Sequence, residues 1–191
     1  MQQRRLVMEN KYICYIGRPS YQKNTFFLLD VVRRTVEICP EVKFLLLGVG
    51  FYSPDLERMK EIIAEYHIEN KIELHPWLDH KETLIYVKNS LFYLTVARYE
   101  GLPLSVLEAM SLGKAIVASD VAGNKDCVKN GYNGYLLPMD VNVFSEKICY
   151  LIENDKAREQ MGRNSRILFE KKFWIENRIH VLEDIYKSVA G

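Results

Sequence analysis

Residues 91–119 read LFYLTVARYEGLPLSVLEAMSLGKAIVAS, and this stretch indicates the fold of the chain. An apolar run at 91–96 is followed by a polar loop and then by a helical pattern at 103–112, which begins with a proline and ends before a glycine. A second apolar run follows at 115–119. Two runs of strand length joined by a helix are typical of a strand–helix–strand unit with parallel strands.

The same alternation extends along the rest of the chain. It predicts an α/β fold: a Rossmann-like, doubly wound parallel sheet of six strands, covered by helices on both faces and followed by C-terminal helices that break around 172–174. The further strands are expected at 12–16, 43–47, 71–74 and 135–137, and the further helices at 24–38, from 53 to about 67, after 79, from 140 to about 154 and from 155 to 189.

Two helix starts carry specific capping signals. Ser53 is predicted to cap the helix that opens with Pro54, since serine is a good N-cap and proline fits the first turn. Asp79 is predicted to cap the next helix, with Glu82 three residues later in the capping-box position.

Composition narrows the class of protein. The chain has 191 residues, 48% hydrophobic and 27% charged, with a net charge of +1, and this is typical of a globular domain with a core of its own. A near-neutral chain lacks the basic field of a nucleic-acid binder. The four cysteines contain no CxxC pair and the histidines show no metal-ligand spacing, so we expect a reduced, cytoplasmic setting and no metal site.

Ligands of open parallel sheets bind at the carboxyl ends of the strands, so the loops after the strands are the candidate sites. The loop at 17–23 carries Arg18 and Lys23 and leads to a helix N-terminus, a combination that suits an anion. The alternative is a pair of solvated surface cations. The loop at 48–53 begins like a dinucleotide fingerprint, but Ser53 replaces the third glycine and the loop follows the second strand.

Two glutamates mark the segment after the fourth strand. Glu100 lies in the loop beside Gly101, and Glu108 lies inside the following helix among apolar residues, where a carboxylate needs a polar partner or a ligand. Backbone donors, two cations and two carboxylates together suit a ligand with phosphates in the middle and hydroxyl-rich groups at both ends. A nucleotide-diphosphate sugar fits that description.

These residues resemble the C-terminal, donor-binding domain of retaining glycosyltransferases with the GT-B fold, specifically family 4. The most specific part is EGLPLSVLEAMSLGKAIVAS, at 100–119. The other features in the family's order are Gly17-Arg18, Lys23, the glycine loop at 48–50, Gly123, the segment NGYNGYLL at 130–137 and an aromatic-bearing terminal helix.

The resemblance implies a role for each matching position. Arg18 and Lys23 hold the diphosphate and stabilise the leaving nucleotide, and Glu100 faces the donor sugar, so these three are the implied catalytic residues. Glu108 accepts hydrogen bonds from the ribose hydroxyls, and the segment HPWL, at 75–78, lies where the family holds the base. The implied donor-binding residues are Gly17, Gly50, Trp77, Leu78, Gly101, Leu102, Leu104 and Glu108.

The resemblance also implies the reaction. A metal-independent hexosyltransferase without a cofactor would move a sugar from a nucleotide-diphosphate donor, UDP- or GDP-linked, with retention of anomeric configuration. The acceptor would be a glycan, a lipid-linked sugar or a polysaccharide of the cell envelope, and the complete enzyme would work in the cytoplasm, with peripheral contact to the inner face of the membrane. No nucleic-acid partner is expected.

The expected domain covers residues 9–173, and residues 174–191 form a C-terminal helix that in a full enzyme would pack toward an N-terminal domain. The family has that second Rossmann-like domain, which holds the acceptor, ahead of the first strand. Because the chain begins almost directly at the first strand, we expect it to bind a nucleotide sugar and to transfer little sugar alone. Two departures stand out: Phe51 replaces a common proline, and the residues 123–126, GNKD, end in Asp126 where the family's common Gly-Gly-x-x-Glu run ends in the longer glutamate.

Two other functions remain open at this stage. The sheet also permits an NAD(P)-dependent oxidoreductase, although the glycine fingerprint is missing from the first turn. A non-catalytic nucleotide-binding module, in which the glutamate pair survives as local structure, is the second alternative.

Overall fold

The computed structural model describes residues 12–50 and 52–190. Its six-stranded sheet has the order β3-β2-β1-β4-β5-β6, and every neighbouring pair of strands is parallel. This doubly wound order confirms the predicted fold class. The strands are β1 (Tyr12–Ile16), β2 (Lys43–Leu47), β3 (Ile72–His75), β4 (Tyr93–Thr95), β5 (Ile116–Ser119) and β6 (Gly134–Leu137).

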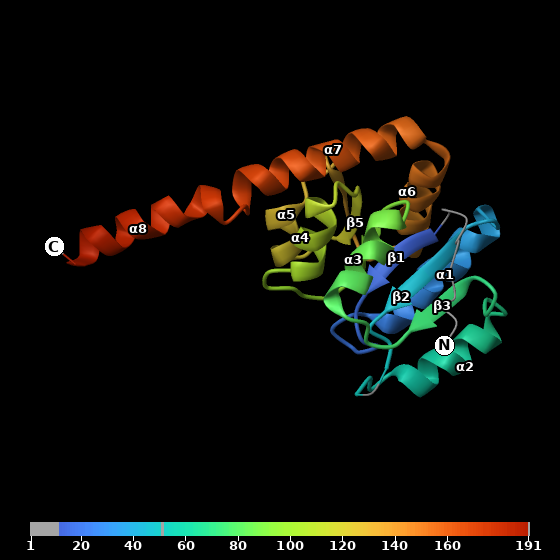
Figure 1. Cartoon of the computed structure of the whole chain (residues 1–191). Coiled ribbons are helices and arrows are strands. Elements are labelled where there is room, and N and C mark those ends of the chain that lie inside the picture. The colour runs from blue at the N-terminus through green and yellow to red at the C-terminus, as the bar shows by residue number, and fades with distance from the viewer. Residues whose placement is uncertain (1–11, 51, 191) are drawn as a thin grey trace, which may run out of the picture.

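Helices cover both faces of the sheet (Figure 1). One face carries α1, α2 and α6, and the other carries α3, α4 and α5, while α7 contributes Met161 to the first core and Leu168 to the second. The helices are α1 (Thr25–Ile38), α2 (Leu56–Glu65), α3 (His80–Asn89), α4 (Leu104–Ser111), α5 (Ala122–Cys127), α6 (Val141–Glu153), α7 (Asp155–Lys172) and α8 (Glu176–Ala190).

Burial on both faces explains why the strands are continuous apolar runs. In β1, Ile13 and Tyr15 enter the core beneath α1, whereas Tyr12 and Cys14 enter the core on the opposite face. All four side chains are at most 3% exposed. A strand buried on both faces needs apolar side chains at every position, because its neighbours in sequence point to opposite cores.

One of the two predicted helix caps is confirmed and the other is wrong. The Asp79 side chain accepts a hydrogen bond from the Glu82 backbone N–H at 2.9 Å, as an N-cap does. In contrast, α2 begins only at Leu56, after Asp55. The Ser53 hydroxyl accepts from the Gly50 N–H at 3.4 Å instead, so this side chain holds the turn after β2, and only the Ser53 carbonyl oxygen meets the helix, by accepting from the Leu56 N–H at 3.1 Å.

The helix α5 was missed by the sequence pattern, which predicted a loop between β5 and β6. It is only six residues long, and its N-cap residue, Val121, makes no side-chain cap. A helix this short, without a capping side chain, leaves no sequence pattern that distinguishes it from a turn. Its position matters, because α5 packs against the loop after β4.

The tail forms the predicted pair of helices, and the second helix extends away from the rest of the molecule (Figure 1). Apolar side chains on this segment face solvent: Ile175 is 63% exposed and Tyr186 is 73% exposed. The packing of α8 toward an N-terminal domain stays a prediction, and so does the division of the chain into residues 9–173 and 174–191. Residues 9–11 lie outside the described residues. Within the described part of the chain, no helix is both long and apolar enough to cross a membrane.

The contact between α7 and the turn after α4 generates a stability prediction. A Cβ atom at Gly162 would lie 2.2 Å from the carbonyl oxygen of Gly113, which itself has a φ of +68°. Gly162→Ala is therefore expected to lower the free energy of unfolding by about 2 kcal/mol, although alanine favours a helix by about 1 kcal/mol over glycine. Urea denaturation measures the difference.

The neighbouring position offers a control on the same helix. Arg163 is exposed, so Arg163→Ala is expected to change stability by less than about 0.5 kcal/mol. A Gly162→Ala variant as stable as wild type would show that α7 does not pack this closely on α4.

Candidate functional site

The loops after β1 and β4 meet where the strand order reverses, between two neighbouring strands of the sheet. Two hydrogen bonds join them: the Arg98 N–H donates to the Gln22 carbonyl oxygen at 2.9 Å, and the Gln22 side-chain amide donates to the Tyr99 carbonyl oxygen at 3.4 Å. In open α/β sheets this reversal point leaves a crevice for a ligand.

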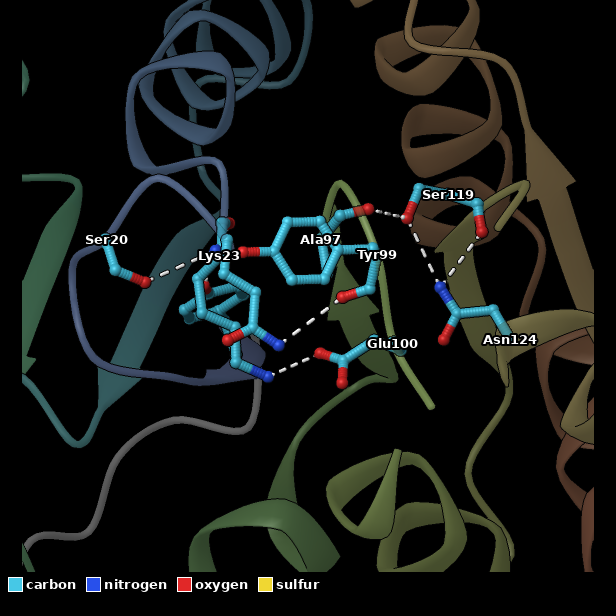
Figure 2. A network of polar contacts seen from close by, with 9 residues as sticks. Ser20, Lys23, Ala97, Tyr99, Glu100, Ser119 and Asn124 are labelled. Carbon is cyan, nitrogen blue, oxygen red and sulfur yellow. Dashed lines mark hydrogen bonds and ion pairs between the residues drawn. The ribbon is translucent and has the colours of Figure 1, made fainter. Parts of the chain in front are cut away.

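An ion pair spans the same point. Lys23 Nζ lies 2.6 Å from Glu100 Oε1, and the two side chains are 21% and 10% exposed (Figure 2). Two of the three residues that the resemblance implies as catalytic are therefore in contact. Shielding from water strengthens the attraction between these charges compared with a pair on the surface.

The backbone of Lys23 is held by neighbouring side chains. Its N–H donates to the Ser20 hydroxyl at 3.3 Å, and its carbonyl oxygen accepts from the Tyr15 hydroxyl at 3.2 Å. Burial, with a smaller contribution from the Glu100 carboxylate, raises the pKa of Tyr15 well above its usual value. The Tyr15 hydroxyl therefore stays protonated and remains a donor to Lys23.

Gly17 leaves the space that the lysine stem occupies. A Cβ atom at this position would lie 2.8 Å from the Tyr15 hydroxyl oxygen and 3.2 Å from Lys23 Cδ. Gly50 lies beside Trp77, since a Cβ atom there would be 3.7 Å from Trp77 Cδ1. Both glycines thus lie at the predicted edge of the sheet, one under the ion pair and one beside the segment expected to hold the base.

Arg18 occupies a different part of the same loop. Its side chain is exposed and lines a hollow of about 470 Å³ together with Tyr52, Ser53 and Pro54. The structure therefore places Arg18 toward the loop after β2, whereas Lys23 points toward the loop after β4.

The N-terminus of α4 follows the loop that carries Glu100. The Val106 and Leu107 N–H groups donate to the Pro103 carbonyl oxygen at 2.9 and 3.1 Å, so the N–H groups just before them lie at the open end of the helix. Leu102 and Leu104 are 53% and 66% exposed, and Gly101 is exposed as well. Three of the residues that the resemblance implies as donor-binding are thus exposed at the start of α4.

Glu108 has a polar partner that the sequence did not single out. Its Oε1 atom lies 2.9 Å from Nε2 of His80, the first residue of α3. Glu108 is partly buried, and Trp77, just before α3, is 69% exposed while Leu78 is partly buried. One signal in the sequence could have identified His80. It directly follows the capping residue Asp79, so it lies in the first turn of a helix that begins at the same edge of the sheet as the site.

The helix α5 touches the loop that carries Glu100. The Gly123 N–H donates to the Glu100 carbonyl oxygen at 3.1 Å, and a Cβ atom at Gly123 would lie 2.3 Å from the Gly101 carbonyl oxygen. Only glycine permits this approach, which gives a physical reason for Gly123. Among residues 12–50 and 52–190, no three side chains of His, Cys, Asp or Glu gather into a group suited to a metal ion.

The chain belongs to the family described as glycosyl transferases group 1, whose model matches residues 1–167. It is 32% identical over 186 residues to an uncharacterised glycosyltransferase of Methanocaldococcus jannaschii, covering 94% of this chain and 45% of that protein. It is 26% identical over 174 residues to the UDP-Gal:alpha-D-GlcNAc-diphosphoundecaprenol alpha-1,3-galactosyltransferase of Escherichia coli, covering 90% and 44%.

A solved structure has the same fold. The crystal structure of Anabaena HepE in complex with UDP and glucose superimposes with a TM-score of 0.82 at 18% identity, covering 97% of this chain and 50% of that chain. The chain thus spans about half the length of the relatives it matches.

The Lys23–Glu100 contact generates a second prediction. In a double-mutant cycle with Lys23→Met and Glu100→Gln, the coupling energy for unfolding is expected to be about 2 kcal/mol, because each single variant leaves a shielded charge without its partner. Urea denaturation of the four proteins gives the coupling directly.

The exposed pair Lys60–Glu57 on α2 serves as the control. Its nitrogen and oxygen atoms are 2.9 Å apart, but the side chains are 52% and 80% exposed, so solvent screens the attraction. If Lys23 and Glu100 coupled no more strongly than this surface pair, the ion pair would not be holding the two loops together.

Proposed function

We propose that this chain is the donor-binding half of a retaining glycosyltransferase, which binds a nucleotide-diphosphate hexose and serves its transfer to a glycan, lipid-linked or polysaccharide acceptor. One observation carries the proposal. A cation (Lys23), a carboxylate (Glu100) and the N-terminus of α4 converge where the strand order reverses. This set of groups matches a ligand that combines phosphates with sugar hydroxyls.

The diphosphate would lie between Lys23 and the N-terminus of α4. Both carry positive charge, one as an ammonium group and the other as free backbone N–H groups with the helix dipole. When the bond between the sugar and the diphosphate breaks, negative charge builds on the leaving phosphate, and fixed positive groups stabilise it. This chemistry is metal-independent. Arg18 would add a second cation from the other side of the same loop.

Glu100 would orient the donor sugar. In the free protein its carboxylate is neutralised by Lys23, so a bound diphosphate shares the lysine with it. The remaining carboxylate oxygen can accept hydrogen bonds from sugar hydroxyls. Retention of anomeric configuration is proposed from the resemblance to the family.

The nucleoside would bind along the adjacent edge. Glu108 would accept hydrogen bonds from the ribose hydroxyls, and His80 holds its carboxylate at 2.9 Å. Trp77 and Leu78, next to Gly50, would border the base. A UDP-linked donor is favoured over a GDP-linked one by two relatives: the Escherichia coli galactosyltransferase is named for UDP-Gal, and the Anabaena structure contains UDP.

The acceptor belongs to the part of the enzyme that this chain does not cover. The chain spans about half of its relatives, so we propose that it binds the donor and transfers little sugar alone. A lipid-linked acceptor is supported by the diphosphoundecaprenol compound in the name of the Escherichia coli relative. Such an acceptor places the complete enzyme in the cytoplasm, at the inner face of the membrane.

Nucleotide binding is the direct test. A thermal-shift panel of UDP, GDP, ADP, their common sugar derivatives and NAD, all in EDTA, is expected to show stabilisation by one nucleoside diphosphate. At one hundred times its dissociation constant, a ligand adds about 2.7 kcal/mol to the free energy of unfolding. Lys23→Ala is expected to abolish the shift, whereas Lys60→Ala, an exposed lysine on α2, keeps it.

The same panel separates the competing functions. Stabilisation by NAD without any nucleoside diphosphate would identify an oxidoreductase and contradict the proposal. Equal nucleotide binding in wild type and in the Lys23→Ala variant would indicate a nucleotide module that does not use this site.

A further inference from the structure

A chain of buried hydrogen bonds runs from α5 to the loop that carries Glu100. The Ser119 hydroxyl donates to the Ala97 carbonyl oxygen at 2.6 Å. The Asn124 side-chain N–H₂ donates to the Ser119 carbonyl oxygen at 2.9 Å and to the Ser119 hydroxyl at 3.2 Å (Figure 2). Ser119 and Asn124 are both 0% exposed. In so dry a position each bond is electrostatically strong.

With these bonds, four consecutive residues of the loop have backbone groups tied to other elements. Ala97 is held by Ser119, Arg98 and Tyr99 are held by Gln22, and Glu100 is held by the Gly123 N–H. The loop is thus clamped between the loop after β1 and α5. A loop held on both sides keeps its side chains in one arrangement, as a precise binding group requires.

The side chain of Asn124 carries a cost in folding stability. Its side-chain oxygen is buried and has no hydrogen-bond partner within the described part of the chain. An unsatisfied buried polar atom destabilises a fold, and an apolar residue of similar shape would avoid that cost. Positioning of the loop explains its presence better than stability does.

We propose that Asn124 and Ser119 are positioning residues for Glu100, an inference that rests on the donor-binding function proposed above. They act through the backbone at Ala97 and set where the Glu100 carboxylate meets the donor sugar. The groups expected to hold the nucleoside, Glu108 and residues 75–78, come from other elements. Loss of the clamp should therefore weaken recognition of the sugar far more than binding of the nucleotide.

The test compares Ser119→Ala with a matched control, Ser165→Ala. Ser165 is also fully buried and also pairs with a buried asparagine: its hydroxyl donates to the Asn133 carbonyl oxygen at 3.2 Å and accepts from the Asn133 side chain at 3.4 Å. Asn133 precedes β6, at the end of the sheet away from the site. Both variants remove a comparable buried hydroxyl, so a merely structural effect would appear in both.

The first readout is amide hydrogen exchange of the free chain. Ser119→Ala is expected to speed exchange at residues 98–101 about tenfold, the factor that corresponds to one lost hydrogen bond, while Ser165→Ala leaves these amides as in wild type. If the two variants gave the same exchange at 98–101, the positioning role would be overturned. This readout needs no ligand, so it decides the role of Ser119 even if no nucleotide binds and the donor-binding function fails.

The second readout is calorimetric binding of UDP, UDP-glucose, UDP-galactose, GDP and GDP-mannose. The relevant quantity is the ratio of the affinity for a sugar nucleotide to the affinity for its nucleoside diphosphate, taken for the sugar nucleotide that wild type binds best. Ser119→Ala and Asn124→Ala are expected to reduce this ratio about tenfold, with the affinity for the nucleoside diphosphate unchanged within about twofold. Ser119→Thr, which keeps the hydroxyl, restores the sugar's contribution. If Asn124→Ala fails to fold, Ser119→Ala alone decides the comparison. Equal losses for nucleotide and sugar nucleotide, or none, would contradict the proposal.

Discussion

The ion pair between Lys23 and Glu100 is the contact on which the site depends. It joins the loops after β1 and β4, two neighbouring strands whose connections diverge at the reversal of strand order. The other contacts described between these loops are the two hydrogen bonds of Gln22 and the Arg98 guanidinium, which lies 4.5 Å from the centroid of the Tyr21 ring. Every group proposed to meet the diphosphate or the sugar lies on one of these loops or on the helices that follow them.

The packing around this pair is arranged to hold two opposite charges at one place. Gly17 leaves room for the lysine stem, the protonated Tyr15 hydroxyl fixes the lysine backbone, and Gly123 lets α5 approach the glutamate backbone. A charged ligand that enters therefore finds its partners already oriented, so little reorganisation opposes binding. The donor-binding interpretation follows from this pre-arrangement, and the membership in the glycosyltransferase family supports it.

Sequence patterns predicted the fold well because strands buried on both faces leave continuous apolar runs, and because Asp79 follows a strong capping rule. They failed where the chain uses weak or competing signals: α5 is short and has no side-chain cap, and the Ser53 hydroxyl bonds Gly50 rather than an N–H group of α2. They also could not show the contacts of the site. The pairing of Lys23 with Glu100, and of Glu108 with His80, depends on which loops the sheet order brings together.

The central claim is that a nucleoside diphosphate binds where the strand order reverses. Titration of UDP and GDP into the isotope-labelled chain, followed by amide NMR shifts, tests it residue by residue. The account predicts that the large shifts cluster at the loop after β1, at residues 100–104 and at residues 75–80. Shifts concentrated at the opposite end of the sheet, around the hollow lined by residues 38–42, Ile152, Glu153, Asp155 and Arg158, would contradict it, and so would an unchanged spectrum.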